Sequence, residues 1–154
     1  MVMTVAEASA FDMLETLTDA GRVGRFTRQR FGEMARQVSE GAAFTLRDGE
    51  GRLIAVSGLW PEADHAEAWL AVGPAFRANL RGAMRQLGAL LTGVAEGSGT
   101  QEVRLYVAKA RGAERVAGAR LATWSGFIRS GEEATPLGPV EVYRRSFGGP
   151  RHGQ

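Results

Sequence analysis

The chain has 154 residues, 44% of them apolar and 23% charged, and this length and composition predict one domain with a hydrophobic core. The formal net charge is only +2, an excess too small and too evenly spread to indicate nucleic-acid binding. Cysteine is absent, which excludes disulfides, thiolate metal sites and a cysteine nucleophile, and the two histidines, His65 and His152, are too few and too far apart for a histidine-rich metal centre.

The beginning of the sequence carries neither the basic flank nor the long apolar core of a signal peptide. No apolar run approaches the roughly 18 to 20 residues that a membrane span needs. We therefore expect a cytoplasmic protein that has neither a membrane nor a nucleic acid among its partners.

The first 40 residues predict one short strand and two helices. The strand is expected over residues 1–5 and the helices over 9–20 and 27–40, where apolar residues recur at helical spacing. Ser9 is the expected N-cap of the first helix, because a serine hydroxyl can accept a hydrogen bond from an unpaired N–H group of the first turn. Glycines follow both helices and are expected to end them.

The next part of the chain changes to extended structure. Residues 44–47 and 52–59 predict the two strands of a β-hairpin, joined by the glycine-containing turn Asp48–Gly51. This acidic turn resembles a calcium loop only superficially, since it lacks enough ligands, and we expect no metal site in the chain. A further strand is expected over residues 66–72.

Helices and strands alternate through the rest of the sequence. We expect a helix with an apolar stripe over 77–96, a strand over 103–108 and a helix over 111–125. A proline-containing loop then leads to a last strand over 140–147, and residues 148–154 are expected to form a flexible tail. In the helix expected over 111–125, the buried side should comprise Val116, Ala117, Leu121 and Trp124.

The turn between the strand over 66–72 and the following helix has features of an anion site. A Gly-Pro turn that feeds directly into a helix directs several backbone N–H groups, and the positive end of the helix dipole, at one place. Arg77 and Arg81 add positive charge there. This pattern is typical of a pyrophosphate-binding turn. The alternative is that the turn is only a connection and that Leu80 only begins the apolar stripe of its helix.

The element order β-α-α-β-β-β-α-β-α-β predicts an α+β fold, in which helices cover both faces of a mixed sheet. Three stretches of the sequence resemble the Gcn5-related N-acetyltransferase (GNAT) superfamily. The family's signature runs valine, any residue, proline, two residues, glutamine or arginine, two residues, glycine, any residue, glycine or alanine. Matching it in register are Val72, Pro74, Arg77 and Gly82. Leu80 stands in the place of the first glycine.

The other two stretches lie nearer the ends of the sequence. In the family a late helix ends in leucine, four residues and a Gly-Phe pair, with another glycine a few positions on. The matching residues are Leu121, Gly126, Phe127 and Gly131. Residues 1–12 are similar to the family's first strand and to the acidic start of its first helix. With the element order included, the resemblance covers nearly the whole chain.

The resemblance implies a single GNAT-like acyltransferase domain over residues 1–147, with acetyl-CoA as co-substrate and no metal. It implies that the CoA pyrophosphate lies on the N–H groups of residues 77–83. The candidate CoA-binding residues are Val72, Arg77, Ala78, Asn79, Leu80, Arg81, Gly82 and Ala83. The implied acceptor is an amine of a small molecule or a peptide, and the protein is expected to be a monomer or a homodimer.

Acetyl transfer needs a base that removes the amine proton and an acid that protonates the leaving thiolate. Glu67 is the candidate base, because it shares a strand face with Trp69, although it could equally be a solvated residue near a strand end. His65 is the alternative base. In many family members the acid is a tyrosine at the position that Ala122 occupies here.

Two functions of different classes follow from these patterns. The first is an acyl-CoA-dependent N-acyltransferase. The second is a catalytically inactive GNAT-fold protein with a binding or structural role, which Leu80 and Ala122 favour because they replace residues that the family uses. Residues 67–69, Glu-Ala-Trp, also resemble compact phage- or prophage-encoded members.

Overall fold

The computed structural model describes residues 3–9, 11–12, 15, 35–108, 113–135 and 138–147. The strands are β1 (Thr4–Glu7), β2 (Ala42–Arg47), β3 (Leu53–Pro61), β4 (Ala66–Val72), β5 (Glu102–Ala108), β6 (Ile128–Thr135) and β7 (Gly138–Ser146). The helices that lie wholly within the described residues are a 3-10 turn, η2 (Arg77–Asn79), and the α-helices α3 (Leu80–Gly97) and α4 (Ala113–Trp124).

Within the described residues the seven strands form one mixed sheet in the order β1-β2-β3-β4-β5-β7-β6. β4 and β5 run parallel, whereas β1–β2, β2–β3, β5–β7 and β6–β7 pair antiparallel. A mixed sheet combined with helices confirms the α+β fold class.

The two helices expected before residue 41 lie mostly outside the described residues. Residues 11–12, 15 and 35–40 are described, and all of them are helical. The expected tail over 148–154 lies outside the described residues as well.

The described residues divide into two compact units. One contains the described part of 1–60 together with 69–91, and the other contains 61–68 together with the described part of 92–154. The expected single domain over 1–147 therefore stays a prediction, and each unit is described by itself.

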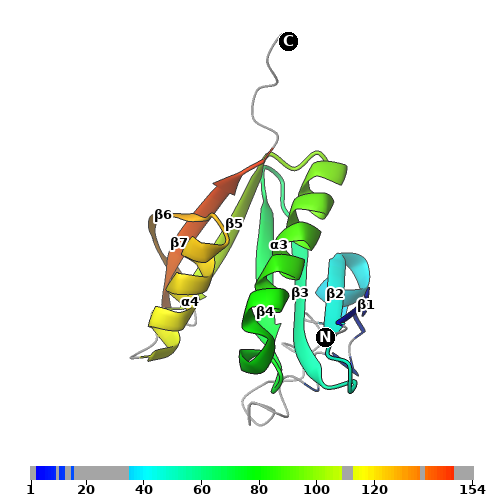
Figure 1. The fold of residues 1–154 in the computed structure, drawn as a ribbon. Coiled ribbons are helices and arrows are strands. Elements are labelled where there is room, and N and C mark those ends of the chain that lie inside the picture. The colour runs from blue at the N-terminus through cyan, green and yellow to red at the C-terminus, as the bar shows by residue number, and fades with distance from the viewer. Residues whose placement is uncertain are drawn as a thin grey trace. The chain divides into compact units, whose positions relative to one another are not determined.

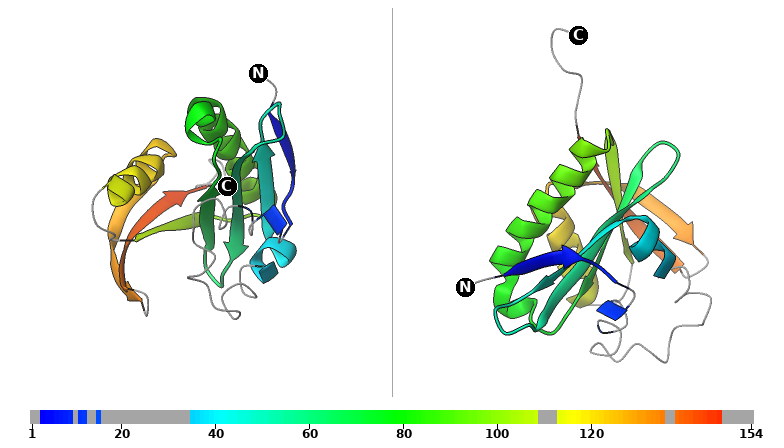
Figure 2. Two further views of the ribbon diagram at one scale, coloured as in Figure 1. Left: turned by 90° about the horizontal axis from the view of Figure 1, so that it is seen from below. Right: turned by 90° about the vertical axis from the view of Figure 1, so that its right-hand side faces the viewer.

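In the first unit β1, β2 and β3 lie side by side (Figures 1 and 2). Val38, Ala43, Leu53 and Val56 form a buried apolar cluster, and Trp69 packs against it. The expected β2–β3 hairpin is confirmed. Its turn is held by Asp48, whose carboxylate accepts hydrogen bonds from the N–H groups of Glu50 and Arg52 at 2.9 Å each.

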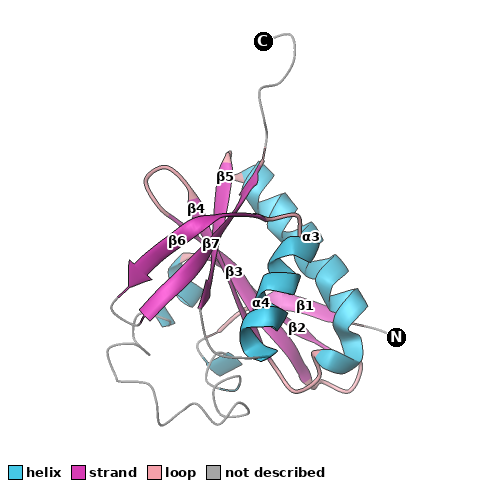
Figure 3. Cartoon of the chain, turned by 90° about the vertical axis from the view of Figure 1, so that its left-hand side faces the viewer, coloured by secondary structure: helices cyan, strands magenta, loops and turns pink. Residues whose placement is uncertain are grey.

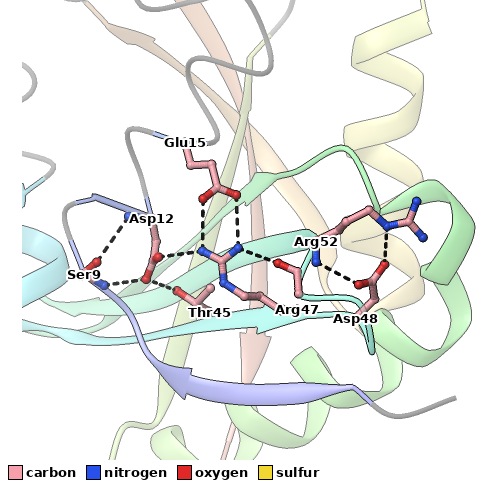
Figure 4. Close-up of polar contacts among 8 residues, drawn as sticks. Ser9, Asp12, Glu15, Thr45, Arg47, Asp48 and Arg52 are labelled. Atoms are coloured by element: carbon pink, nitrogen blue, oxygen red, sulfur yellow. Dashed lines mark hydrogen bonds and ion pairs between the residues drawn. The ribbon is translucent and has the colours of Figure 1, made fainter.

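A polar cluster joins the segment after β1 to the hairpin (Figure 4). The Asp12 N–H donates to Ser9 Oγ at 3.4 Å, and the Ser9 N–H donates to Asp12 Oδ2 at 2.9 Å, which is the reciprocal pattern of a capping box. Ser9 is thus confirmed as a helix N-cap. Arg47 on β2 lies 3.0 Å from Asp12 Oδ1 and 3.2 Å from Glu15 Oε1, and Thr45 also donates to Asp12.

These contacts decide the ionisation of Asp12. Burial alone would raise the pKa of the Asp12 carboxyl, but the hydrogen bonds from Ser9, Thr45 and Arg47, with the charge of Arg47, lower it below its ordinary value. The lowered pKa stabilises the folded chain above the ordinary carboxyl range, and this contribution is lost as the pH falls through the folded-state pKa.

In the second unit the start of β4 pairs with β5, and β7 lies between β5 and β6. Helix α4 contacts β5 and β6, and Figures 1 and 2 show it against one face of these strands. Val103 and Val107 of β5 are buried, whereas Arg104 and Tyr106, which alternate with them, are only half-buried. The expected strand with one more polar face is therefore confirmed.

Strand β6 is a correction to the sequence prediction, which placed a loop between the last helix and the last strand. It pairs antiparallel with β7 and is beside it in Figure 3. No residue of β6 is buried, so its sequence lacks the apolar alternation of a strand with one face in the core. Its register also shifts between Arg129 and Gly131, which breaks the period of two.

The end of α4 explains the Gly-Phe pair of the family motif. Gly126 has a φ of +86°, and its N–H donates to Thr123 O at 3.0 Å. The Phe127 N–H donates to Ala122 O at 3.0 Å, so the helix ends in a Schellman turn. Phe127 is buried. The glycine and the phenylalanine thus serve helix termination and packing.

Trp124 is a second correction, because it was expected on the buried side of its helix. Its exposed fraction is 57%. It is the last residue of α4, and the Schellman turn that follows places Phe127 in the apolar contact there.

Among the described helices, none is long and apolar enough to span a membrane.

Candidate functional site

The turn between β4 and α3 is fastened to β3 by backbone contacts. The Gly73 N–H donates to Ile54 O at 2.8 Å, and the Ala75 N–H donates to Leu53 O at 3.0 Å. A Cβ atom at Gly73 would lie only 2.5 Å from Leu53 O and 2.8 Å from Leu53 Cγ. Only glycine permits this close approach, so the glycine before the proline fixes where the turn lies.

The predicted CoA-binding residues divide by exposure along this turn. Five of them are exposed: Val72, Arg77, Ala78, Arg81 and Gly82. Leu80 is half-buried, and Asn79 and Ala83 are buried. The exposed residues of η2 and α3 recur at helical spacing, so both arginines and Gly82 share the solvent side of the helix start. Whether this side binds a pyrophosphate stays a prediction.

Asn79 contributes to the turn from inside. Its Nδ2 donates to Ala75 O at 2.8 Å, and its N–H donates to Phe76 O at 3.1 Å. The side chain is buried, and Ala75 and Phe76 are buried as well. Asn79 therefore stabilises the turn from its buried side, and its own N–H group is already occupied by the hydrogen bond to Phe76 O.

Leu80 occupies a conformation that needs no glycine. Its φ of −53° and ψ of −51° are ordinary right-handed helical values. A glycine at position 80 would therefore differ from leucine in having no side chain, and its greater backbone freedom would not be needed. The leucine keeps the backbone N–H and adds bulk beside it.

We expect Leu80→Gly to tighten CoA binding in calorimetric titrations, because it removes the side chain from the phosphate approach. It should cost about 1 kcal/mol of stability for the glycine, plus the packing that is lost. Leu90→Gly is the matched control, a half-buried leucine of the same helix outside the turn. Unchanged or weaker CoA binding in a folded Leu80→Gly variant would show that Leu80 does not obstruct the site.

The candidate base, Glu67, lies near the start of β4 in the second unit. Its Cα pairs with that of Arg104 on β5, and its side chain keeps 35% of its surface exposed. Arg104 forms an ion pair with Glu102 at 2.7 Å and a hydrogen bond with Tyr106. Burial, and then the negative charge of Glu67, raise the pKa of the Tyr106 phenol. Glu67 thus belongs to a polar strand face.

His65 was the alternative base, and it lies beside Glu67. His65 Nε2 is 3.7 Å from Glu67 Oε1, and His65 Nδ1 is 2.6 Å from Asp64 Oδ1. The hydrogen bond from His65, with the charges of His65 and Arg104, lowers the pKa of the Asp64 carboxyl. Sequence reasoning missed Arg104 and Tyr106, because only the register of β4 against β5 brings them to Glu67.

The position that holds the family's tyrosine is closed in this chain. Ala122 is fully buried in α4, and its carbonyl accepts the hydrogen bonds of the helix end. A tyrosine introduced there would have to displace core atoms. The two tyrosines of the chain, Tyr106 and Tyr143, lie on β5 and β7 instead.

Trp69 lies on the other part of β4, in the first unit. It packs against the cluster around Val56, and a Cβ atom added at Gly58 would lie 2.8 Å from its ring. Its backbone carbonyl accepts a hydrogen bond from Ser57 Oγ at 2.8 Å. These contacts make Trp69 a packing residue of the core.

No family model matches the sequence, and no curated protein matches it at a significant level. Solved structures do match. A point mutant of the spermidine N-acetyltransferase SpeG from Vibrio cholerae has a TM-score of 0.68 at 14% identity, covering 94% of this chain and 93% of that one.

Two further structures are similar over comparable lengths. The ribosomal-protein-S5-alanine acetyltransferase from Vibrio fischeri has a TM-score of 0.68 at 10% identity, over 97% of this chain and 95% of that one. A candidate acetyltransferase of the GNAT family from Desulfovibrio desulfuricans has a TM-score of 0.67 at 14% identity, over 94% and 98%. The chain therefore has the fold of the GNAT superfamily, which its sequence motifs resemble.

Proposed function

We propose that this chain is an acyl-CoA-dependent N-acyltransferase, which moves an acetyl group from acetyl-CoA to an amine of a small molecule or a peptide. The observation that carries the proposal is the turn after β4. Gly73 fixes it against β3, and Arg77 and Arg81 stand exposed on the first turns of the helix that it opens. Oriented N–H groups with adjacent arginines suit a diphosphate.

The similar structures support an amine as the acceptor. Their names specify spermidine in one case and an alanine of a ribosomal protein in the other. Acetyl-CoA is a metabolite of the cell interior, so we place the reaction in the cytoplasm. The proposed reaction is compatible with either a monomer or a homodimer.

In the proposed reaction Glu67 removes a proton from the protonated acceptor amine, and the free nitrogen then attacks the thioester carbonyl and loses a second proton to water. A C–N bond forms, the C–S bond breaks, and the CoA thiolate takes a proton. Since Ala122 supplies no acid, water protonates the thiolate, and turnover should be slow. A positioned acid is typically worth about 100- to 10,000-fold.

The second candidate function is a binding or structural module on the same fold. Two observations favour it: Leu80 replaces the first glycine of the family's signature, and Ala122 is buried where the family carries its tyrosine. This protein would bind without catalysing transfer. Fold alone does not decide between the two candidates.

Acetyl-CoA at millimolar concentration is expected to raise the melting temperature, because a ligand that binds only the folded chain stabilises it by mass action, by about 2.7 kcal/mol at 100 times its Kd. The Arg77→Ala/Arg81→Ala double variant should lose most of this shift. Arg85→Ala, an exposed arginine one turn further along α3, is the matched control and should keep it. If acetyl-CoA gives neither a thermal shift nor heat in calorimetry, the acyltransferase proposal is wrong.

A further inference from the structure

His65 lies between two carboxylates. Its Nδ1 is 2.6 Å from Asp64 Oδ1 and its Nε2 is 3.7 Å from Glu67 Oε1. The His65 side chain keeps 10% of its surface exposed, and Nε2 is buried without a hydrogen-bond partner among the described residues. A buried ring nitrogen without a partner is costly, so its position beside Glu67 calls for a physical reason.

The contact with Asp64 fixes where the neutral ring carries its proton. Asp64 keeps 75% of its side-chain surface exposed, and His65 and Arg104 both favour its ionised form. An ionised carboxylate only accepts hydrogen bonds, so His65 Nδ1 must be the donor at 2.6 Å. The neutral ring therefore presents the lone pair of Nε2 to Glu67.

One more proton can be placed between His65 Nε2 and Glu67 Oε1. A lone pair at Nε2 and a carboxylate oxygen do not attract each other, which agrees with their separation of 3.7 Å. A proton on either atom would turn the contact into a hydrogen bond. Glu67 is part-exposed, so a small rotation of its side chain can close the gap.

The surrounding charges hold the arrangement in place. Arg104 Nη2 lies 3.9 Å from Asp64 Oδ2, and Arg104 is in turn paired with Glu102 and hydrogen-bonded to Tyr106. The hydrogen bond from His65, and then the charges of His65 and Arg104, favour the ionised form of the Asp64 carboxyl. Glu62 contributes through its backbone, because its N–H donates to His65 O at 2.8 Å.

We propose that His65 receives, at Nε2, the proton that Glu67 removes from the acceptor amine, and that Asp64 orients the ring for this transfer. The proposal rests on the acyltransferase function. The proton moves from Glu67 Oε1 to His65 Nε2, which makes the ring an imidazolium between two carboxylates and restores Glu67 as a base. Loss of one proton from the ring to water completes the cycle. His65 is thus a positioning residue, since it acts through Glu67.

The first test needs no activity. The chain has two histidines, so nitrogen NMR of the 15N-histidine-labelled protein, with His152→Gln for assignment, reads the ring of His65 directly. The neutral ring should carry its proton on Nδ1, whereas free histidine prefers Nε2. Asp64→Ala removes the acceptor and should move the proton to Nε2. A proton on Nε2 in the unmodified protein would overturn the proposal.

The second test uses the reaction. His65→Ala should lower kcat at least about tenfold, part of the 100-fold or more that a positioned proton-transfer group contributes, with the KM for acetyl-CoA unchanged. Added imidazole should restore part of the lost rate, which a merely structural residue would not allow. A folded His65→Ala variant that keeps its kcat, or that imidazole does not rescue, contradicts the relay.

A failure of the proposed function can be distinguished from a failure of the proton relay through His65. If the ring carries its proton on Nδ1 and the protein transfers no acetyl group to any amine, the proposed function is wrong and the relay falls with it. If the protein transfers acetyl groups with a proton on Nε2, only the role of His65 is wrong.

Discussion

Glu67→Gln is expected to lower the rate of acetyl transfer at pH 7 by about 100-fold or more, the usual contribution of a positioned base. An amine with an ordinary pKa near 10 is almost fully protonated at that pH, so its proton must be removed before it attacks. The loss should shrink as the pH rises toward 10, because free amine becomes abundant. The measurement is the pH dependence of kcat/KM for both proteins.

The control for this prediction is Glu96→Gln, which neutralises an exposed carboxylate on α3. It should leave both the rate and its pH profile unchanged. If Glu67→Gln transfers acetyl groups with the unmodified pH profile, Glu67 is not the base, and the base is then His65 or a chain of water molecules.

Gly73→Ala should destabilise the fold by about 1–3 kcal/mol, the typical cost of an overpacked position. The added Cβ would meet the backbone oxygen of Leu53 at 2.5 Å, and a backbone oxygen in a strand cannot move aside as a flexible side chain can. For a chain of this size the melting temperature should fall by roughly 2–12 °C. Acetyl-CoA binding should weaken as well, because the turn after β4 is displaced.

Gly93→Ala provides the matched control with the opposite sign. Gly93 lies inside α3, is exposed, and has open space where a Cβ would be added. Alanine is favoured over glycine in a helix by about 1 kcal/mol, so this variant should be more stable. If chemical denaturation shows Gly73→Ala to be as stable as the unmodified chain, the contact with β3 does not fix the turn.

Local patterns made much of the fold predictable. Strand β4 was predicted with the bounds that the structure has, because an apolar run ends there in Gly-Pro. Ser9 was predicted as an N-cap from its residue type, and the structure adds the reciprocal contact with Asp12. The helix predicted to end at residue 96 ends at Gly97, and the Schellman turn that follows it contains Gly99, with a φ of +71°. Each of these features depends on neighbours in sequence.

The features that could not be predicted depend on partners far along the chain. β6 has no apolar face of its own and is a strand only because β7 pairs with it. Arg104 comes opposite Glu67 through the parallel register of β4 and β5, about 37 positions apart in sequence, which no local period reveals. The direction of the His65 ring likewise depends on side-chain contacts and not on spacing.

The Gly-Phe pair after α4 is part of the family motif, but its role in this structure is independent of any reaction. Gly126 and Phe127 end a helix and fill the core, and neither needs a substrate to be useful. Both would remain useful in a protein of this fold that did not use acetyl-CoA, because the end of α4 and the packing around Phe127 depend on them. The Gly-Phe pair therefore indicates the fold and not the reaction, so the acyltransferase proposal must be tested at the groups that handle protons.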